Sequence, residues 1–254
     1  MTAAALRKNP KTKLKTGLKT LVNDCLHAFD SNFCSCWAGI EGSRSGEGEA
    51  PMKLYDSKVA PNPRRTRIFL AEKGITLPTE QVDIAAMQHK TPEYTAINPL
   101  QRLPALVLDD GTIITESIAI CRYFEMFRPD PPLFGVGSKD VAVVEMWNRR
   151  AEINFFANVA AVFRHTHPAM KDLEIPQVPA WAEANRPRVT WFLELLDREL
   201  ATRRYVAGDR YTIADITMQV AVDFMKPGRL SMPEGATNVK RWHAEVSARP
   251  SAIA

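Results

Sequence analysis

The sequence lacks long apolar runs and is poor in cysteine, and each shortage excludes a class of protein. No apolar stretch approaches the roughly 20 residues that a helix needs to span a bilayer, so we expect a soluble protein with no membrane partner. There are only 4 cysteines among 254 residues, and Cys25, Cys34 and Cys36 lack the C-x-x-C spacing of zinc sites. Cys121 falls on the apolar face of a candidate helix, as a small buried hydrophobe. We therefore expect no disulfide framework, no metal and a reducing, cytoplasmic setting.

A strong excess of one charge is also missing. The net charge is +4 and the pI is near 8.9, and the first nineteen residues hold six Lys or Arg and no acid. The remainder of the chain is therefore not basic, which disfavours nucleic acid as a partner. A hydrophobic content of 45% is ordinary for a globular fold.

Residues 1–51 differ in composition from the rest of the chain. A basic run over 7–19 precedes a short amphipathic candidate over 18–29, and 39–51 is rich in Gly, Ser and Glu, which is typical of a linker. We expect a basic, disordered extension. Three interpretations remain open: a tail or misassigned upstream start, a docking segment, and an organellar targeting peptide, which the acidic residues of this stretch disfavour.

From Met52 the hydrophobic period alternates between that of strands and that of helices. The expected elements are strand 53–57, helix 64–73, strand 79–84, helix 92–96, hairpin strands 105–108 and 112–114, and a helix beginning at Ser117. Gly74 suits the C-terminus of the first helix, and the prolines of 129–132 end the last one. The order βαβαββα over 52–128 resembles a thioredoxin-like domain.

The stretch 93–127 is predicted to form a binding site made largely from backbone. Because proline cannot donate a ladder hydrogen bond, Leu103-Pro104 is expected in a loop that enters an edge strand at Ala105. Asp109-Asp110-Gly111 is typical of a tight hairpin turn. Thr115-Glu116-Ser117 supplies cap residues for the next helix, whose first N–H groups have no internal partner. That helix start suits a carboxylate or a phosphate.

After a linker over 129–138, the pattern is helical throughout 139–254. Ser138 is expected to cap a long amphipathic helix that ends at Pro168, and a second long helix is expected over 181–200. Thr212 and Asp215 have the spacing of a capping box, in which each side chain bonds the other residue's backbone N–H. These elements predict a separate all-helical domain, so the fold class is α/β plus all-α.

Two motifs resemble a known family. One is Asn98-Pro99-Leu100-Gln101-Arg102-Leu103-Pro104-Ala105-Leu106, followed by Asp110-Gly111 and Glu116-Ser117-Ile118-Ala119-Ile120, and the other is Val206 to Ile216. Together they resemble the bacterial cytosolic glutathione S-transferases, and the resemblance covers Met52 to Ala254. It implies a thioredoxin-like βαβαββα domain followed by a helical-bundle domain, and glutathione as co-substrate.

The resemblance also implies how glutathione is held. Leu103-Pro104 is expected to be a cis peptide whose Leu103 backbone pairs with the cysteinyl unit. Glu116 and Ser117 are expected to hold the γ-glutamyl amine and carboxylate. Basic and amide side chains near the glycine carboxylate complete the expected site: Lys90, Gln101 and Arg102.

The chemistry requires a stabilised thiolate, and the resemblance points to Asn62, in the loop before the first helix. Ser57, Tyr55 and backbone N–H groups remain open as alternatives. An amide is no base at neutral pH, so Asn62 can act only by donating a hydrogen bond to sulfur. Lowering a thiol pKa from about 8.5 by about two units requires roughly 2.7 kcal/mol, which such a bond and a helix N-terminus together supply.

The resemblance places the acceptor site beside the long helix of the second domain. Its candidate residues are Phe155, Asn158, Arg164 and His165. The implied function is conjugation of glutathione to a hydrophobic electrophile, as in detoxification, by a twofold homodimer. Two alternatives stay open: a glutathione-dependent disulfide or peroxide reductase, and a non-enzymatic interaction protein with the same fold.

Overall fold

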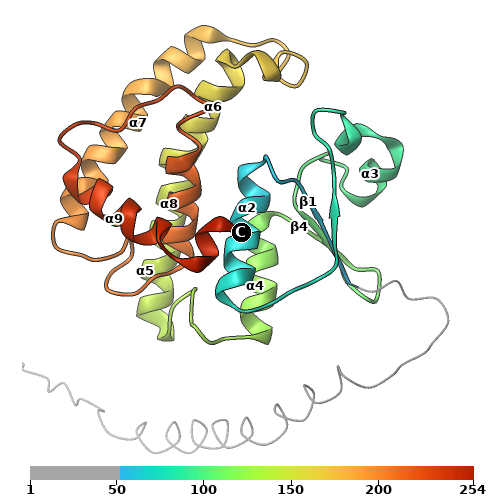
Figure 1. Cartoon of the computed structure of the whole chain (residues 1–254), viewed down its shortest axis with the longest axis horizontal. Coiled ribbons are helices and arrows are strands. Elements are labelled where there is room, and N and C mark those ends of the chain that lie inside the picture. The colour runs from blue at the N-terminus through green and yellow to red at the C-terminus, as the bar shows by residue number, and fades with distance from the viewer. Residues whose placement is uncertain (1–51) are drawn as a thin grey trace, which may run out of the picture. The chain divides into compact units, whose positions relative to one another are not determined.

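The structure is a computed structural model that describes residues 52–254 (Figure 1). The expectations for residues 1–51, including their three cysteines and the amphipathic candidate, lie outside the described residues.

The first part of the described chain is a four-stranded mixed sheet with helices. In chain order its elements are β1 (Lys53–Asp56), α2 (Pro61–Glu72), β2 (Thr79–Gln81), the 3-10 turn η1 (Gln88–Lys90), α3 (Pro92–Ile97), β3 (Ala105–Val107), β4 (Ile113–Thr115) and α4 (Ser117–Phe127). The strand order is β2-β1-β3-β4, with β1 and β2 parallel and the other neighbours antiparallel. The predicted βαβαββα order is confirmed.

Helix α2 begins earlier than its hydrophobic pattern indicated. It starts at Pro61, not Arg64, because proline has a helical φ and suits the first helical position, so Asn62 lies in the first turn. The predicted end is confirmed: the helix stops at Glu72 and Gly74 follows with φ +62°. Strand β2 stops at Gln81, short of the expected Ile84.

The prediction that Ala105 begins an edge strand is wrong. Strand β3 lies between β1 and β4 and pairs with both from Ala105 onward. Pro104 precedes the ladder, so its missing N–H breaks no ladder bond and does not confine the strand to an edge. The expected cis peptide at Leu103-Pro104 is confirmed.

The second part is helical. It contains α5 (Gly137–Arg149), a π-helical stretch (Arg150–Phe156), α6 (Ala157–Thr166), α7 (Pro179–Leu200), α8 (Ile213–Asp223) and α9 (Thr237–Ser247), with 3-10 turns at Pro168–Met170 and Pro250–Ile253. The first three follow one another without a break, and the predicted end before Pro168 is confirmed. The capping role of Ser138 is not: the helix starts at Gly137, and Asp140 accepts the hydrogen bond of the Val136 N–H at 2.7 Å.

The sheet part and the helical part share a core. Leu54 and Leu106 of the sheet and Phe69 of α2 pack in one cluster that also contains Ile213, Ile216 and Val220 of α8. A second cluster fills the helical part, around Phe155, Phe192 and Trp242. Helix α2 therefore lies between the sheet and α8, as Figure 1 shows.

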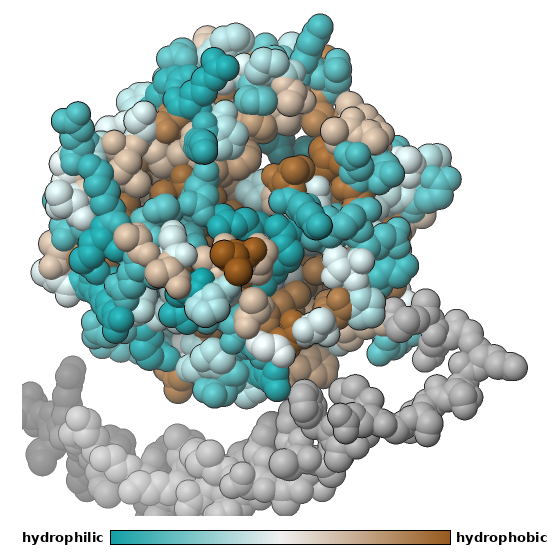
Figure 2. Space-filling view, in the orientation of Figure 1, coloured by the Kyte–Doolittle hydropathy of each residue, from teal (hydrophilic) through white to brown (hydrophobic). Residues whose placement is uncertain are grey.

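The face seen in Figure 2 is mostly hydrophilic and is hollowed between the helices around α6 and the sheet part around α3, with apolar residues beside the hollow. None of the helices within residues 52–254 is long and apolar enough to cross a membrane.

Candidate functional site

The start of α2 has few free backbone donors. Pro61 and Pro63 carry no N–H, and the Arg64 N–H bonds the Ala60 carbonyl at 3.3 Å. The N-cap Ala60 offers no capping side chain. Asn62 therefore supplies the first-turn N–H that remains for a ligand, in addition to its side-chain amide.

The three candidates for thiolate stabilisation differ in placement. Asn62 is exposed at the helix start. Ser57 is buried, and its carbonyl accepts bonds from the Ala60 N–H and from Arg67. Tyr55 alternates with Leu54 on β1 and packs edge-on against Tyr94 of α3, with ring centroids 5.9 Å apart. Its ring thus lies on the other face of the sheet from α2 and is half-buried, whereas Asn62 is the most exposed of the three candidates.

The loop before the cis proline is held by α3 and the residue that follows it. The carbonyl of Arg102 accepts the Tyr94 hydroxyl at 2.6 Å and the buried Asn98 amide at 2.8 Å. Gln101 has φ +54°, and its amide bonds Thr95 at 3.0 Å. These contacts fix the peptide before Leu103. Since the ladder starts at Ala105, the Leu103 backbone lies outside it and makes none of the ladder hydrogen bonds.

Basic side chains border this loop. Lys90 and Arg102 are exposed, while the neighbouring His89 is buried. Burial lowers the pKa of His89, and the charges of Lys90 and Arg102 lower it further. The lowered pKa keeps His89 neutral at pH 7, so the positive charge beside this loop comes from Lys90 and Arg102.

The start of α4 is not capped as the sequence predicted. The helix begins at Ser117, but no side chain caps it, and the N-cap Glu116 has φ +68°. A non-glycine residue with such a φ is strained, and strain of this kind gathers at binding sites. Glu116 is exposed and Ser117 is buried. The first N–H groups of α4 are thus left without a side-chain acceptor.

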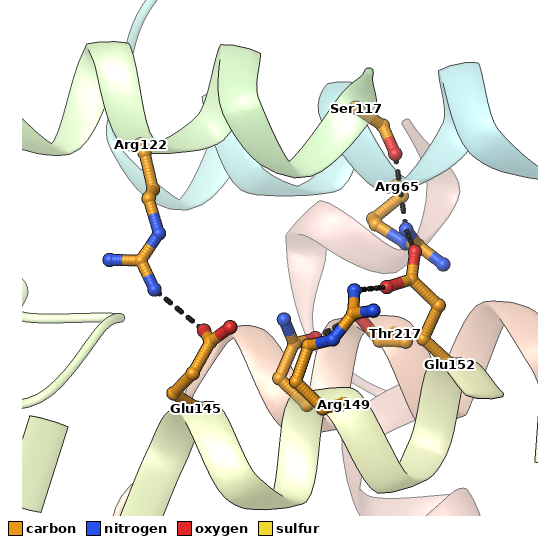
Figure 3. A network of polar contacts seen from close by, with 8 residues as sticks. Arg65, Ser117, Arg122, Glu145, Arg149, Glu152 and Thr217 are labelled. Atoms are coloured by element: carbon orange, nitrogen blue, oxygen red, sulfur yellow. Dashed lines mark hydrogen bonds and ion pairs between the residues drawn. The ribbon is translucent and has the colours of Figure 1, made fainter. Parts of the chain in front are cut away.

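A buried polar network lies beneath Ser117 (Figure 3). Arg65 of α2 donates through Nη1 to Ser117 Oγ and to Glu152 Oε1, both at 3.1 Å. Glu152 also pairs with Arg149 at 2.5 Å. Arg65 is 1% exposed, whereas its neighbour Arg64 bonds Asp223 at 2.6 Å.

The sequence did contain an indication that Arg65 is buried. It stands three and four residues before Ile68 and Phe69, which are fully buried, and so shares their helix face. Glu152 gave no such signal, because the π-helical stretch shifts the spacing on which a helix-face argument depends.

The acceptor candidates divide into core and surface residues. Phe155 is fully buried and stacks on Phe192, so it is a core residue. Asn158 bonds the Asn154 carbonyl within its own helix at 2.6 Å. Arg164 and His165 lie 3.3 Å and 3.9 Å from Glu174, at the end of α6.

Arg102 is influenced by charges of both parts of the chain. Partial desolvation of its otherwise exposed side chain lowers its pKa, as does the positive charge of Arg164, while Glu174 and Glu116 oppose the change.

Other candidate chemistry lies elsewhere. Cys121 is buried as predicted, and burial raises the pKa of its thiol to about 12, so it is no nucleophile at neutral pH. Within residues 52–254 no cluster of three or more His, Cys, Asp or Glu could hold a metal. A cavity of about 640 Å³ near the end of α8 and α9 contains none of the predicted site residues.

Two family models match the chain. The model of the glutathione S-transferase N-terminal domain matches residues 59–126, and that of the C-terminal domain matches residues 140–250. Glutathione S-transferase 2 of Saccharomyces cerevisiae is 33% identical, over 79% of this chain and 87% of its own length. Glutathione S-transferase 3 of Zea mays is 29% identical, over 80% and 91%.

Solved structures agree. A glutathione S-transferase domain-containing protein of Marinobacter aquaeolei superposes with a TM-score of 0.76 at 37% identity, over 78% of this chain and 98% of that one. Gtt2 of Saccharomyces cerevisiae gives a TM-score of 0.76 at 32% identity, over 79% and 98%. Since the relatives come from yeast, plants and bacteria, they leave the expected bacterial character open.

Proposed function

The chain belongs to the glutathione S-transferase family and is a glutathione transferase, and from this premise we propose how its own residues bind and activate glutathione. Residues 52–128 form the glutathione-binding domain and 139–254 the helical domain, joined by 129–138. The tripeptide lies along the Leu103 backbone, with its γ-glutamyl end at Glu116 and Ser117, its glycine end near Lys90, Gln101 and Arg102, and its thiol at Asn62.

One observation carries this proposal: α4 starts without a side-chain cap, with Glu116 held at φ +68° and Ser117 backed by a buried arginine. A helix start that leaves its first N–H groups open favours a carboxylate. The Glu116 carboxylate is exposed beside it and suits the ligand's ammonium group. A free α-amino acid end, with its ammonium and carboxylate groups on the same carbon, matches this pair.

Asn62 stabilises the thiolate. With Pro61 and Pro63 on either side, it supplies the open N–H of the first turn as well as its side-chain amide. A hydrogen bond to a charged group contributes about 1.5–3 kcal/mol and a helix start about 0.3–1 kcal/mol. Together they match the roughly 2.7 kcal/mol needed to lower a thiol pKa by about two units.

The transfer step follows from the thiolate. The thiol proton leaves to solvent, and the sulfur forms a bond to an electrophilic carbon of a hydrophobic acceptor. A leaving group departs with its electron pair, or, in an addition, the adjacent carbon takes up a proton. Asn158, Arg164 and His165 border the acceptor side, whereas Phe155 supports it from the core.

We further propose a cytoplasmic homodimer. Met126 and Phe127 are adjacent at the end of α4 and are 77% and 51% exposed, so they offer an apolar surface that suits a self-complementary interface. Sedimentation of Phe127→Arg against wild type tests this, with a shift to monomer expected.

The experiment that tests the proposed function combines binding and turnover. Titration calorimetry with glutathione measures binding, and absorbance with 1-chloro-2,4-dinitrobenzene, an activated aryl halide, measures conjugation. We expect both. A chain that binds no glutathione at millimolar concentration contradicts the proposal. Binding with disulfide or peroxide reduction, but without conjugation to any electrophile, favours the reductase alternative instead.

A further inference from the structure

A fully buried arginine lies behind the proposed carboxylate site. Arg65 is 1% exposed, and its Nη1 donates to Ser117 and Glu152. Its Nε and Nη2 are also buried and have no hydrogen-bond partner among residues 52–254. Buried donors without partners destabilise a fold, so packing alone does not explain an arginine here.

Arg65 stays charged although it is buried. Glu152 is the carboxylate paired with it, and Glu152 also pairs with the half-exposed Arg149. Burial lowers the pKa of Arg65, while Glu152, Cys121 and Glu116 oppose the change, and a guanidinium keeps its proton in proteins. A buried cation therefore lies beneath the start of α4.

The contact with Arg65 also orients the Ser117 hydroxyl. A guanidinium can only donate, so Ser117 Oγ must accept the bond from Arg65 Nη1 at 3.1 Å. The single hydroxyl proton then points away from Arg65 and is free to be donated. Accepting a charge-assisted bond polarises the hydroxyl and makes it a better donor.

The helical domain holds Arg65 in place. Glu152 and Phe156 both lie in the π-helical stretch Arg150–Phe156. Glu152 receives the Nη1 bond, and the Phe156 ring centroid lies 5.3 Å from the guanidinium carbon, as in a cation–π contact. Figure 3 shows Arg65 reaching between α4 and the helix that carries Glu152. The π-helical stretch thus supports a site built on the other domain.

We propose that Arg65 is a positioning residue for the α-carboxylate of the γ-glutamyl unit. It turns the Ser117 hydroxyl outward as a donor and places a buried positive charge behind it, so that the site selects ligands with a carboxylate at that end. This inference rests on the proposed function, because it presumes that glutathione binds there.

The test compares two ligands by calorimetry. One is glutathione, and the other is 4-aminobutyryl-cysteinyl-glycine, which lacks only the α-carboxylate of the γ-glutamyl unit. Wild type is expected to prefer glutathione by at least tenfold. Arg65→Met is expected to lose about tenfold of that preference, chiefly through weaker glutathione binding, while its affinity for the analogue changes less than twofold.

Two further variants separate positioning from structure. Arg64→Met is the matched control: it removes the same charge from the next residue of α2, where the partner is Asp223, and should leave the preference unchanged. Arg65→Lys keeps the charge on a flexible chain and should retain part of the preference, and it serves the same comparison if Arg65→Met does not fold. Arg65→Met should reduce the preference for glutathione less in a Ser117→Ala background than in wild type, because the two residues act together.

If Arg65→Met, or Arg65→Lys where that variant replaces it, loses affinity equally for both ligands, the inference is overturned and Arg65 is a structural residue. A wild-type chain that binds neither ligand would instead overturn the proposed function itself.

Discussion

Two helices of this molecule start in opposite ways. At α8 the chain supplies its own anion: Asp215 is fully buried and accepts bonds from the N–H groups of Thr212 at 2.9 Å and Val206 at 2.8 Å and from Trp242 Nε1 at 2.9 Å. At α4 no side chain caps the helix, and the N-cap Glu116 is strained and exposed.

Because the start of α8 is capped by a side chain and the start of α4 is not, we infer that the two helix starts have different roles. Both have the same unpaired N–H groups and the same dipole. A start closed by its own carboxylate contributes to folding and is unavailable to ligands. A start without a side-chain cap lacks that stabilisation, and we propose that the α4 start, with a buried cation behind it, uses its free donors to bind a ligand carboxylate. Substitutions at the two starts test this contrast.

The largest effect is expected for Asp215→Ala. It leaves the Trp242 indole and two backbone N–H groups buried without acceptors, so the free energy of unfolding should fall by about 3–5 kcal/mol. Denaturant unfolding monitored by Trp fluorescence measures it, with Asp215→Asn as the control that keeps the shape. A loss below about 1 kcal/mol would show that this start is not a folding element.

The second effect concerns pH. Burial raises the pKa of Asp215 to about 6 in the folded chain, against about 3.9 for an unfolded Asp, so between these values the folded state binds more protons. The contribution of Asp215 to stability is therefore full below about pH 4 and is lost as the pH rises through 6, by about 2–3 kcal/mol.

Urea unfolding of wild type and Asp215→Asn at pH 4, 5, 6 and 7 checks this sign. The stability difference between them should shift against wild type as the pH rises. A difference that does not change with pH would contradict the raised pKa.

A smaller and different effect is expected for Ser117→Ala. Because we propose that the α4 start binds the ligand carboxylate, glutathione affinity should fall about tenfold, while the free energy of unfolding should change by less than about 1 kcal/mol. Thr212→Ala, at the corresponding start of α8, is the matched control and should show the reverse: reduced stability and unchanged affinity. If both variants changed stability and glutathione affinity in the same way, the two helix starts would not differ in role.

The smallest expected effect concerns a third helix start, that of α2, where the proposal places the glutathione thiol. Pro63→Ala restores a backbone N–H in the first turn, next to Asn62. One added donor at a helix start contributes about 0.3–1 kcal/mol, so the pKa of bound glutathione should fall by a further 0.2–0.7 or so. A rise would mean that the thiol does not lie at this turn.

Local patterns in the sequence predicted much of this molecule. The capping box of Thr212 and Asp215, the helix end at Gly74 and the stop before Pro168 each depend on neighbouring residues, and the structure confirms them. The family motif predicted the cis Leu103-Pro104 peptide.

The features that sequence reasoning missed depend on contacts between distant residues. The inner position of β3 depends on which strands pair, and the core position of Phe155 depends on α7. The contact of Arg65 with Glu152 joins residues far apart in the chain, and Glu152 lies in a π-helical stretch that the sequence pattern does not predict. The expected cap of α4 was also wrong, because residue type alone does not show whether a side chain turns toward its own helix.

The measurement that tests the central claim most directly is the pKa of glutathione's thiol on the protein, from ultraviolet thiolate absorbance across pH. In wild type it should lie about two units below the free value of about 8.5, and Asn62→Ala should abolish most of that shift while Ser57→Ala preserves it. Glutathione that binds without a shift in pKa would contradict the account, because the start of α2 would then hold the thiol without activating it.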